Sequence, residues 1–118
     1  MDRLIELGQL FDFYGALLTE RQRMLVRQYA YENLSLAEIA EREGISRQGV
    51  RDGIVRAEQQ LRELEHALHL LERAKLTRNA VEILRQIVEE MPISGEAAAR
   101  MEEQLDRLSD LWEDEDGI

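Results

Sequence analysis

The stretch Leu36-Ala-Glu-Ile-Ala-Glu-Arg-Glu-Gly-Ile-Ser-Arg-Gln-Gly-Val50 decides the fold of this chain. A helix-turn-helix needs a small residue where its two helices cross, and a glycine in the turn four residues later. Ala40 and Gly44 meet these two needs, and Ser46 then caps the second helix. The apolar positions that the motif requires are filled by Leu36, Ile39, Ile45 and Val50. The spacing therefore predicts a helix-turn-helix.

The second helix of this motif carries the residues that point to a function. Arg47, Gln48 and Arg51 lie on its N-terminal face, which enters the major groove in DNA-binding helix-turn-helix proteins. Arginine and glutamine suit bidentate hydrogen bonds to guanine and adenine, and Arg56 lies where it can reach a phosphate. The alternative is a scaffold whose arginines form only a solvated face, because any two crossing helices need the same small residues. Several acidic side chains nearby, Asp52 among them, count against tight DNA binding.

Helix start signals place this motif in a larger helical chain. Thr19 and Ser35 are predicted N-caps, and Glu38 completes a capping box with Ser35. We expect the helix-turn-helix core to span residues 19–62. Apolar spacings of three and four residues continue on both sides of it, which predicts an all-α fold.

The C-terminal part is also predicted to be helical. The helix that starts at Ser46 meets no stop signal before about residue 75, so a long recognition helix over 46–75 is expected. A pair of C-terminal helices follows over 76–113, broken at Pro92, and residues 114–118 form an acidic tail. We expect one domain over the whole chain, residues 1–118.

Apolar residues repeat along 46–75 at alternating spacings of four and three, which is a heptad seam. The seam residues are Val50, Ile54, Ala57, Leu61, Leu64, Leu68 and Leu71. Two readings are open, since the seam can pack on other helices of the same chain or meet its own copy across a two-fold axis. A helix of this length spans about 42 Å, which is long for a domain of this size, and this favours a homodimer.

Composition and charge narrow the function classes. The chain has no cysteine, which excludes disulfides, thiolate metal sites and cysteine nucleophiles. It shows neither a signal peptide nor an apolar run of about 20 residues, so we expect a cytoplasmic protein without a membrane span. The net charge is -10, but residues 19–62 hold eight arginines against seven acids, whereas 63–118 hold six bases against fifteen acids. The helix-turn-helix is thus nearly neutral, which is compatible with contact to nucleic acid.

Catalytic and metal-binding patterns are weak. The sequence holds no nucleophile–base set, phosphate loop or dinucleotide fingerprint, so we expect no enzyme. Glu63 and His66 have the spacing of a carboxylate–histidine pair, and His69 is close by. A third and fourth converging ligand are not evident, so a polar flank beside the seam is the preferred interpretation. We expect neither a metal nor a cofactor.

Three stretches, LFDFYGALLTERQ (10–22), LSLAEIAE (34–41) and SRQGVRD (46–52), resemble the YlxM family of helix-turn-helix proteins. The resemblance covers residues 4–75 and implies a helix-turn-helix similar to the promoter-reading C-terminal domain of sigma factors. It also implies a regulatory role linked to the signal recognition particle pathway, with no enzymatic activity. The resemblance further implies that Arg47, Gln48 and Arg51 lie on the recognition helix.

The chain departs from the family pattern on the recognition helix. Gly49 stands where alanine is common, Gly53 is a second helical glycine, and Val55 is apolar where a basic residue is frequent. Each glycine costs roughly 1 kcal/mol against alanine in a helix. The leading hypothesis is a dimeric regulatory protein that binds DNA. The alternative is a non-enzymatic adaptor that binds the GTPase or the RNA of the signal recognition particle, with the helix-turn-helix as scaffold.

Overall fold

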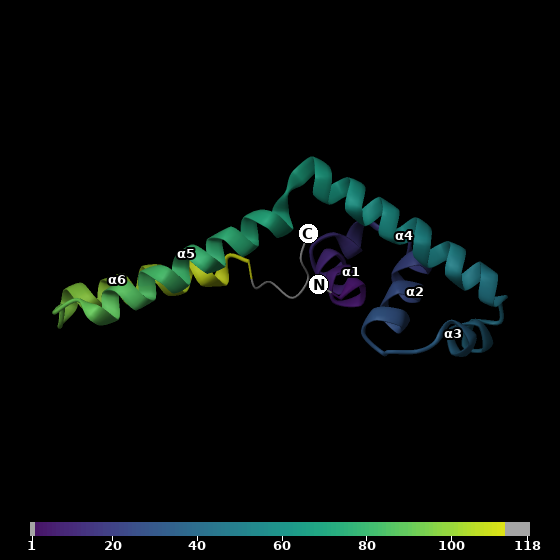
Figure 1. Cartoon of the computed structure of the whole chain (residues 1–118), viewed down its shortest axis with the longest axis horizontal. Helices are drawn as coiled ribbons and strands as arrows, with labels where there is room; N and C mark the ends of the chain where they lie inside the picture. Colours follow the sequence, from purple (N-terminus) through teal and green to yellow (C-terminus); the bar gives the residue numbers. More distant parts are fainter. Residues whose placement is uncertain (1, 113–118) are drawn as a thin grey trace. The chain divides into compact units, whose positions relative to one another are not determined.

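The computed structural model describes residues 2–112, which form six α-helices and one short 3₁₀ helix, with no strand in that range (Figure 1). The helices are α1 (Arg3–Tyr14), α2 (Glu20–Ala30), α3 (Leu36–Glu43), α4 (Arg47–Leu68), α5 (Leu70–Glu90) and α6 (Glu96–Asp110), with the 3₁₀ helix at Gly15–Leu17. The predicted all-α fold is confirmed. The predicted acidic tail, 114–118, lies outside the described residues.

The described chain divides into two compact units, residues 2–69 and 70–112. From the sequence, we expect one domain over the whole chain. The N-terminal unit holds α1 to α4. Its helices begin where side chains satisfy the first free N–H groups. The capping side chains are those of Asp2, Thr19, Ser35 and Ser46, and Thr19 and Ser35 form complete capping boxes. These N-caps set where each helix of the motif starts.

Helix α4 supplies the centre of the N-terminal core by packing against α1, α2 and α3. Its fully or almost fully buried apolar residues are Val50, Ile54, Ala57 and Leu61. This half of the heptad seam therefore packs inside its own chain, and a second copy does not reach it in the folded unit. Leu64 is half-buried and Leu68 is 43% exposed, so only the end of the seam on α4 faces outward.

The continuous helix predicted over 46–75 is wrong, because α4 ends at Leu68 and α5 begins at Leu70. His69 lies between them with φ 58° and ψ 29°, in the left-handed region that closes helices. Its N–H still donates to the Glu65 carbonyl. Leu71, the last predicted seam residue, therefore belongs to α5. No glycine or proline marks this break in the sequence, although histidine tolerates the left-handed region better than most residues.

The C-terminal unit is a helical hairpin in which α5 packs along α6. Val81 and Leu105 are buried in it. The Arg85 guanidinium donates to Glu102 at 2.8 Å and to Asp106 at 2.7 Å, which ties the two helices together. Two C-terminal helices are present, as predicted from the sequence, but the first begins at Leu70 and not at residue 76. None of the helices in residues 2–112 is both long and apolar enough to cross a membrane.

Candidate nucleic-acid interface

The turn between α3 and α4 has a fixed geometry. Gly44 adopts φ 68° and ψ 33°, a left-handed conformation that side chains disfavour. The N–H groups of Gly44 and Ile45 both donate to the Ala40 carbonyl, which closes α3. The Ser46 hydroxyl then accepts from the Gly49 N–H at 2.9 Å, so the recognition helix begins at Arg47.

Small and apolar residues allow the helices of the motif to cross closely. Ile39 and Val50 are fully buried, and Ala40 is almost so, as the sequence pattern predicts. Gly53 has a similar role between α2 and α4, because a Cβ placed there would lie 2.6 Å from the Leu25 Cδ1 atom. This glycine is therefore a packing requirement and not only a weak point of the helix.

The four side chains predicted to contact DNA are all exposed and share the N-terminal half of α4. Arg47, Arg51 and Arg56 have no hydrogen bond or ion pair to other side chains of residues 2–112, so their guanidinium groups are open to an external anion. Gln48 differs, since its Nε2 atom donates to Asp52 Oδ1 at 2.9 Å. Base reading by Gln48 would require this hydrogen bond to be exchanged.

A hollow of about 330 Å³ lies between α2 and α4 beside these residues. Its lining includes Arg56 from the recognition helix together with Gly49, Asp52 and Gly53. Arg21, from the first turn of α2, lines the same hollow. Arg21 is not predictable as a site residue from the sequence, because no periodic pattern links α2 to α4. Two arginines from different helices therefore flank one depression next to the recognition face.

The acidic side chains of α3 are partly occupied by structural roles. Glu38 accepts from the Ser35 N–H in the capping box, and this backbone hydrogen bond lowers the pKa of the Glu38 carboxyl. Glu43 accepts from Gln28 Nε2 at 3.1 Å, which joins α3 to α2. Glu41 stays exposed. These donors are uncharged, so the carboxylates keep their negative charge, and the lowered pKa keeps Glu38 ionised beside the recognition helix.

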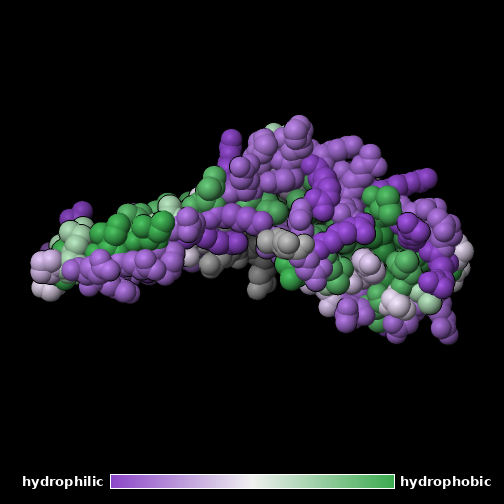
Figure 2. Space-filling view, viewed as in Figure 1, coloured by the Kyte–Doolittle hydropathy of each residue, from purple (hydrophilic) through white to green (hydrophobic). Residues whose placement is uncertain are grey.

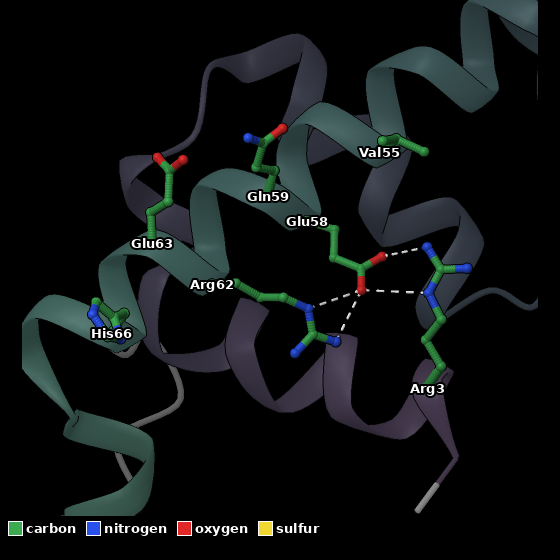
Figure 3. A pocket seen from close by; sticks show the side chains of 7 residues that line it. All are labelled: Arg3, Val55, Glu58, Gln59, Arg62, Glu63 and His66. Carbon is green, nitrogen blue, oxygen red and sulfur yellow. Dashed lines mark hydrogen bonds and ion pairs between the residues drawn. The ribbon is translucent and has the colours of Figure 1, made fainter.

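A second hollow, of about 460 Å³, lies beside α1 and the middle of α4, and Figure 3 shows its lining. Glu58 lies there between two arginines, at 2.6 Å from Arg3 and 2.9 Å from Arg62. Arg62 also pairs with Glu6 at 2.5 Å. Burial raises the pKa of the Glu58 carboxyl, but hydrogen bonds from both arginines outweigh burial and lower it. This network fixes α1 against the recognition helix.

His66 and Glu63 line the same hollow, and the His66 and His69 ring centroids are 6.3 Å apart. Within residues 2–112, no group of three or more histidine or carboxylate side chains is placed to hold a metal ion. The hollow is thus an intramolecular ion-pair site. Its arginines satisfy Glu58 and Glu6 and are not presented to a ligand.

Comparison with known proteins gives consistent matches over nearly the whole chain. A family profile described as "Putative helix-turn-helix protein, YlxM / p13 like" matches residues 1–106. A UPF0122 protein of Shouchella clausii is 38% identical over 111 residues, covering 94% of this chain and 98% of the relative. A UPF0122 protein of Halalkalibacterium halodurans is 39% identical over 102 residues, covering 86% and 94%. One from Bacillus cereus is 36% identical over 108 residues, covering 92% and 98%.

Proposed function

Since the chain belongs to the UPF0122 family of YlxM/p13-like helix-turn-helix proteins, we propose that it binds duplex DNA through the N-terminal face of α4. In this proposal it is a cytoplasmic regulatory protein that acts as a homodimer, and its role is binding and not catalysis. Arg47 and Arg51 contact base edges or phosphates, Gln48 reads a base after releasing Asp52, and Arg56 contacts a phosphate.

One observation carries the proposal. The recognition helix of a helix-turn-helix presents three arginines that are exposed and have no acidic partner among residues 2–112. Arg3, Arg42 and Arg62 of the same unit are each paired with a carboxylate. The arginines of α2 also have no carboxylate partner among residues 2–112, but they do not lie on the recognition helix.

Arg47 and Arg51 lie one turn apart on the same face of α4, whereas Arg56 lies further along on another face. Unpaired cations on the recognition helix attract a polyanion, because binding releases the counterions of the phosphates.

The test is a mobility-shift assay on genomic duplex fragments at low salt. We expect weak binding that falls steeply as salt is added, since the contacts are largely to phosphates. An Arg47→Ala, Arg51→Ala double variant should lose at least about tenfold in affinity, with an unchanged circular dichroism spectrum.

The matched control is an Arg73→Ala, Arg107→Ala double variant, which changes the net charge equally but in the C-terminal unit. It should keep most of the affinity. Equal losses in both variants would mean that binding depends on net charge and not on the recognition helix. If the unmodified chain shifts no fragment at low salt, the DNA proposal fails.

The net charge of -10 favours a second candidate, a protein-binding adaptor of the signal recognition particle, and within it the GTPase over the RNA as the partner. A strongly acidic chain repels nucleic acid at long range, so a basic protein surface is a natural partner. In this case GTP hydrolysis by the particle should change when the chain is added. The Arg47→Ala, Arg51→Ala variant should keep that effect, which would separate the two candidates.

A further inference from the structure

The C-terminal hairpin exposes a continuous apolar surface. On α5 the exposed side chains recur along one stripe, and on α6 a second stripe runs beside it. The large exposed residues are Leu76, Ile83, Leu84, Ile87, Met91, Met101, Leu108 and Leu111. Figure 2 shows hydrophobic side chains gathered along this unit, at the left of the view.

Five of these eight side chains, Leu84, Ile87, Met91, Met101 and Leu108, meet on one side of the hairpin. A groove of about 700 Å³ runs between the two stripes, and both helices line it, with Leu84 and Ile87 from α5 and Met101 and Leu108 from α6. We call the eight exposed residues and this groove the hairpin face. Apolar residues at helical spacing on both helices of a hairpin are the pattern of half a four-helix bundle.

The hairpin is too small to be stable with this face in water. Its four buried apolar side chains are Leu71, Ala74, Val81 and Leu105, fewer than the eight large ones it exposes. Units that approach about 40 residues usually need a disulfide, a metal or a partner. The chain has no cysteine, and residues 2–112 contain no cluster of metal ligands. A partner is the remaining means of covering the face.

The area fits a second copy of the chain. Eight Leu, Ile and Met side chains, each roughly half exposed, leave on the order of 600 Å² of apolar surface, at the upper limit for a monomer. A standard stable interface buries about 800 Å² on each partner, with an apolar core and a polar rim. We propose that two chains pair through their hairpin faces to form a four-helix bundle. This proposal refines the homodimer of the proposed function and does not depend on DNA binding.

Charge along α5 selects the relative direction of the two copies. Residues 70–80 carry Arg73, Lys75 and Arg78 against one acid, a net charge of +2. Residues 81–90 carry three acids against one base, a net of -2. An antiparallel pairing across a two-fold axis sets each positive half against a negative half, whereas a parallel pairing opposes like charges. The α5 helices of the two copies therefore run antiparallel, with the axis near Leu84, the middle of the stripe.

The first experiment measures mass in solution by light scattering at micromolar concentration. The unmodified chain should show twice its 13.8 kDa mass. Ile87→Lys, at the centre of the face, should raise the dimer dissociation constant by about a hundredfold or more, because two charges become buried. A monomeric unmodified chain would overturn the proposal.

Leu68→Lys is the matched control, since Leu68 is 43% exposed and Ile87 is 47% exposed. Leu68 lies at the end of the seam on α4, outside the hairpin face, so this variant should stay dimeric. If Leu68→Lys dissociates the dimer and Ile87→Lys does not, the interface is the α4 seam and the hairpin proposal is wrong.

A second experiment uses disulfide cross-linking, which buries no charge, to test whether the two α5 helices run antiparallel. The chain has no cysteine, so single cysteines can be introduced and oxidised. Leu84→Cys lies near the axis and should form a disulfide-linked dimer. Leu76→Cys lies eight residues away, so its two copies would be about 24 Å apart, too far for a disulfide. Cross-linking at both positions would overturn the antiparallel arrangement, and so would a dimer that cross-links at neither. A dimer that shifts no DNA would refute only the DNA proposal.

Discussion

At the scale of single residues, Glu58 is the ionisable group on which the position of the recognition helix depends most. Its side chain is only 9% exposed, and it accepts hydrogen bonds from Arg3 on α1 and from Arg62 on α4. A buried carboxylate is tolerated when charged donors satisfy it, and removing it leaves two arginines without that partner. Glu58 thus links the first helix to the one that carries the candidate DNA contacts.

Glu58→Gln should lower the free energy of unfolding by about 1–2 kcal/mol at pH 7. The pKa of Glu58 is lowered in the folded chain, so the native state favours the ionised carboxylate. Its contribution is therefore present above the ordinary glutamate pKa and is lost as pH falls through the lowered value. Urea unfolding at pH 7 and near pH 3 should show the difference from the unmodified chain shrinking in acid. Glu63→Gln, on the exposed side of α4, should show little difference at either pH.

The two glycines of the recognition helix should respond differently to alanine. At Gly49 the nearest contact of a Cβ is the Ser46 Oγ atom at 3.1 Å, whereas at Gly53 it is a buried Leu25 methyl at 2.6 Å. Gly49→Ala should raise the free energy of unfolding by about 0.5–1 kcal/mol through helix propensity. Gly53→Ala should be about 1–2 kcal/mol less stable than Gly49→Ala, because overpacking offsets that gain. Equal stabilities in thermal unfolding would contradict the close approach of α2 and α4.

At the scale of elements, the boundary between α4 and α5 separates a DNA-contacting helix from a hairpin helix. It depends on one non-glycine residue in the left-handed region, His69. Such a conformation costs roughly 1–2 kcal/mol for a residue with a Cβ. Glycine accepts it without strain, and a β-branched residue accepts it least.

His69→Gly should therefore be more stable than His69→Ile by at least about 1 kcal/mol. Guanidinium unfolding of the two variants, followed by circular dichroism at the helix signal, measures this difference. The reverse order would mean that α4 continues as one helix through residue 75 in solution, because glycine is the worse residue inside a helix.

At the scale of the whole molecule, DNA binding is proposed for the N-terminal unit and dimerisation for the C-terminal unit. The N-terminal unit presents the arginines of α4, and the C-terminal unit presents the hairpin face. A dimer carries two recognition helices, and two linked contacts with one DNA molecule bind more tightly than one. The acidic residues concentrate beyond residue 62, and at physiological salt their repulsion decays over about 8 Å.

A variant that abolishes the dimer should then weaken DNA binding without touching the DNA contacts. Ile87→Lys should lose at least about tenfold in affinity for a long DNA fragment, because a monomer makes only one of the two linked contacts. Conversely, Arg47→Ala, Arg51→Ala should keep the dimeric mass. Both measurements use the same shift and light-scattering assays. Full affinity in a monomeric Ile87→Lys chain would show that one recognition helix is sufficient.

The sequence by itself determined the parts of this protein that depend on local chemistry. The caps at Thr19, Ser35 and Ser46, the left-handed Gly44 and the small Ala40 were all predictable, since each satisfies backbone groups or sterics within a few residues. The same local rules predicted the all-α fold, the hairpin at Pro92 and the exposure of Arg47 and its neighbours.

Only the tertiary structure decided which apolar stripe is free for a partner. The heptad spacing from Val50 to Leu71 is equally compatible with a partner helix from the same chain or from another copy. Packing by α1 to α3 covers its first half, and the break at His69 ends it. The ion pairs of Glu58 and the need for Gly53 likewise join residues far apart in the chain. The periodicity of a sequence shows that a helix has an apolar side. Which distant segment packs against that side depends on the tertiary structure.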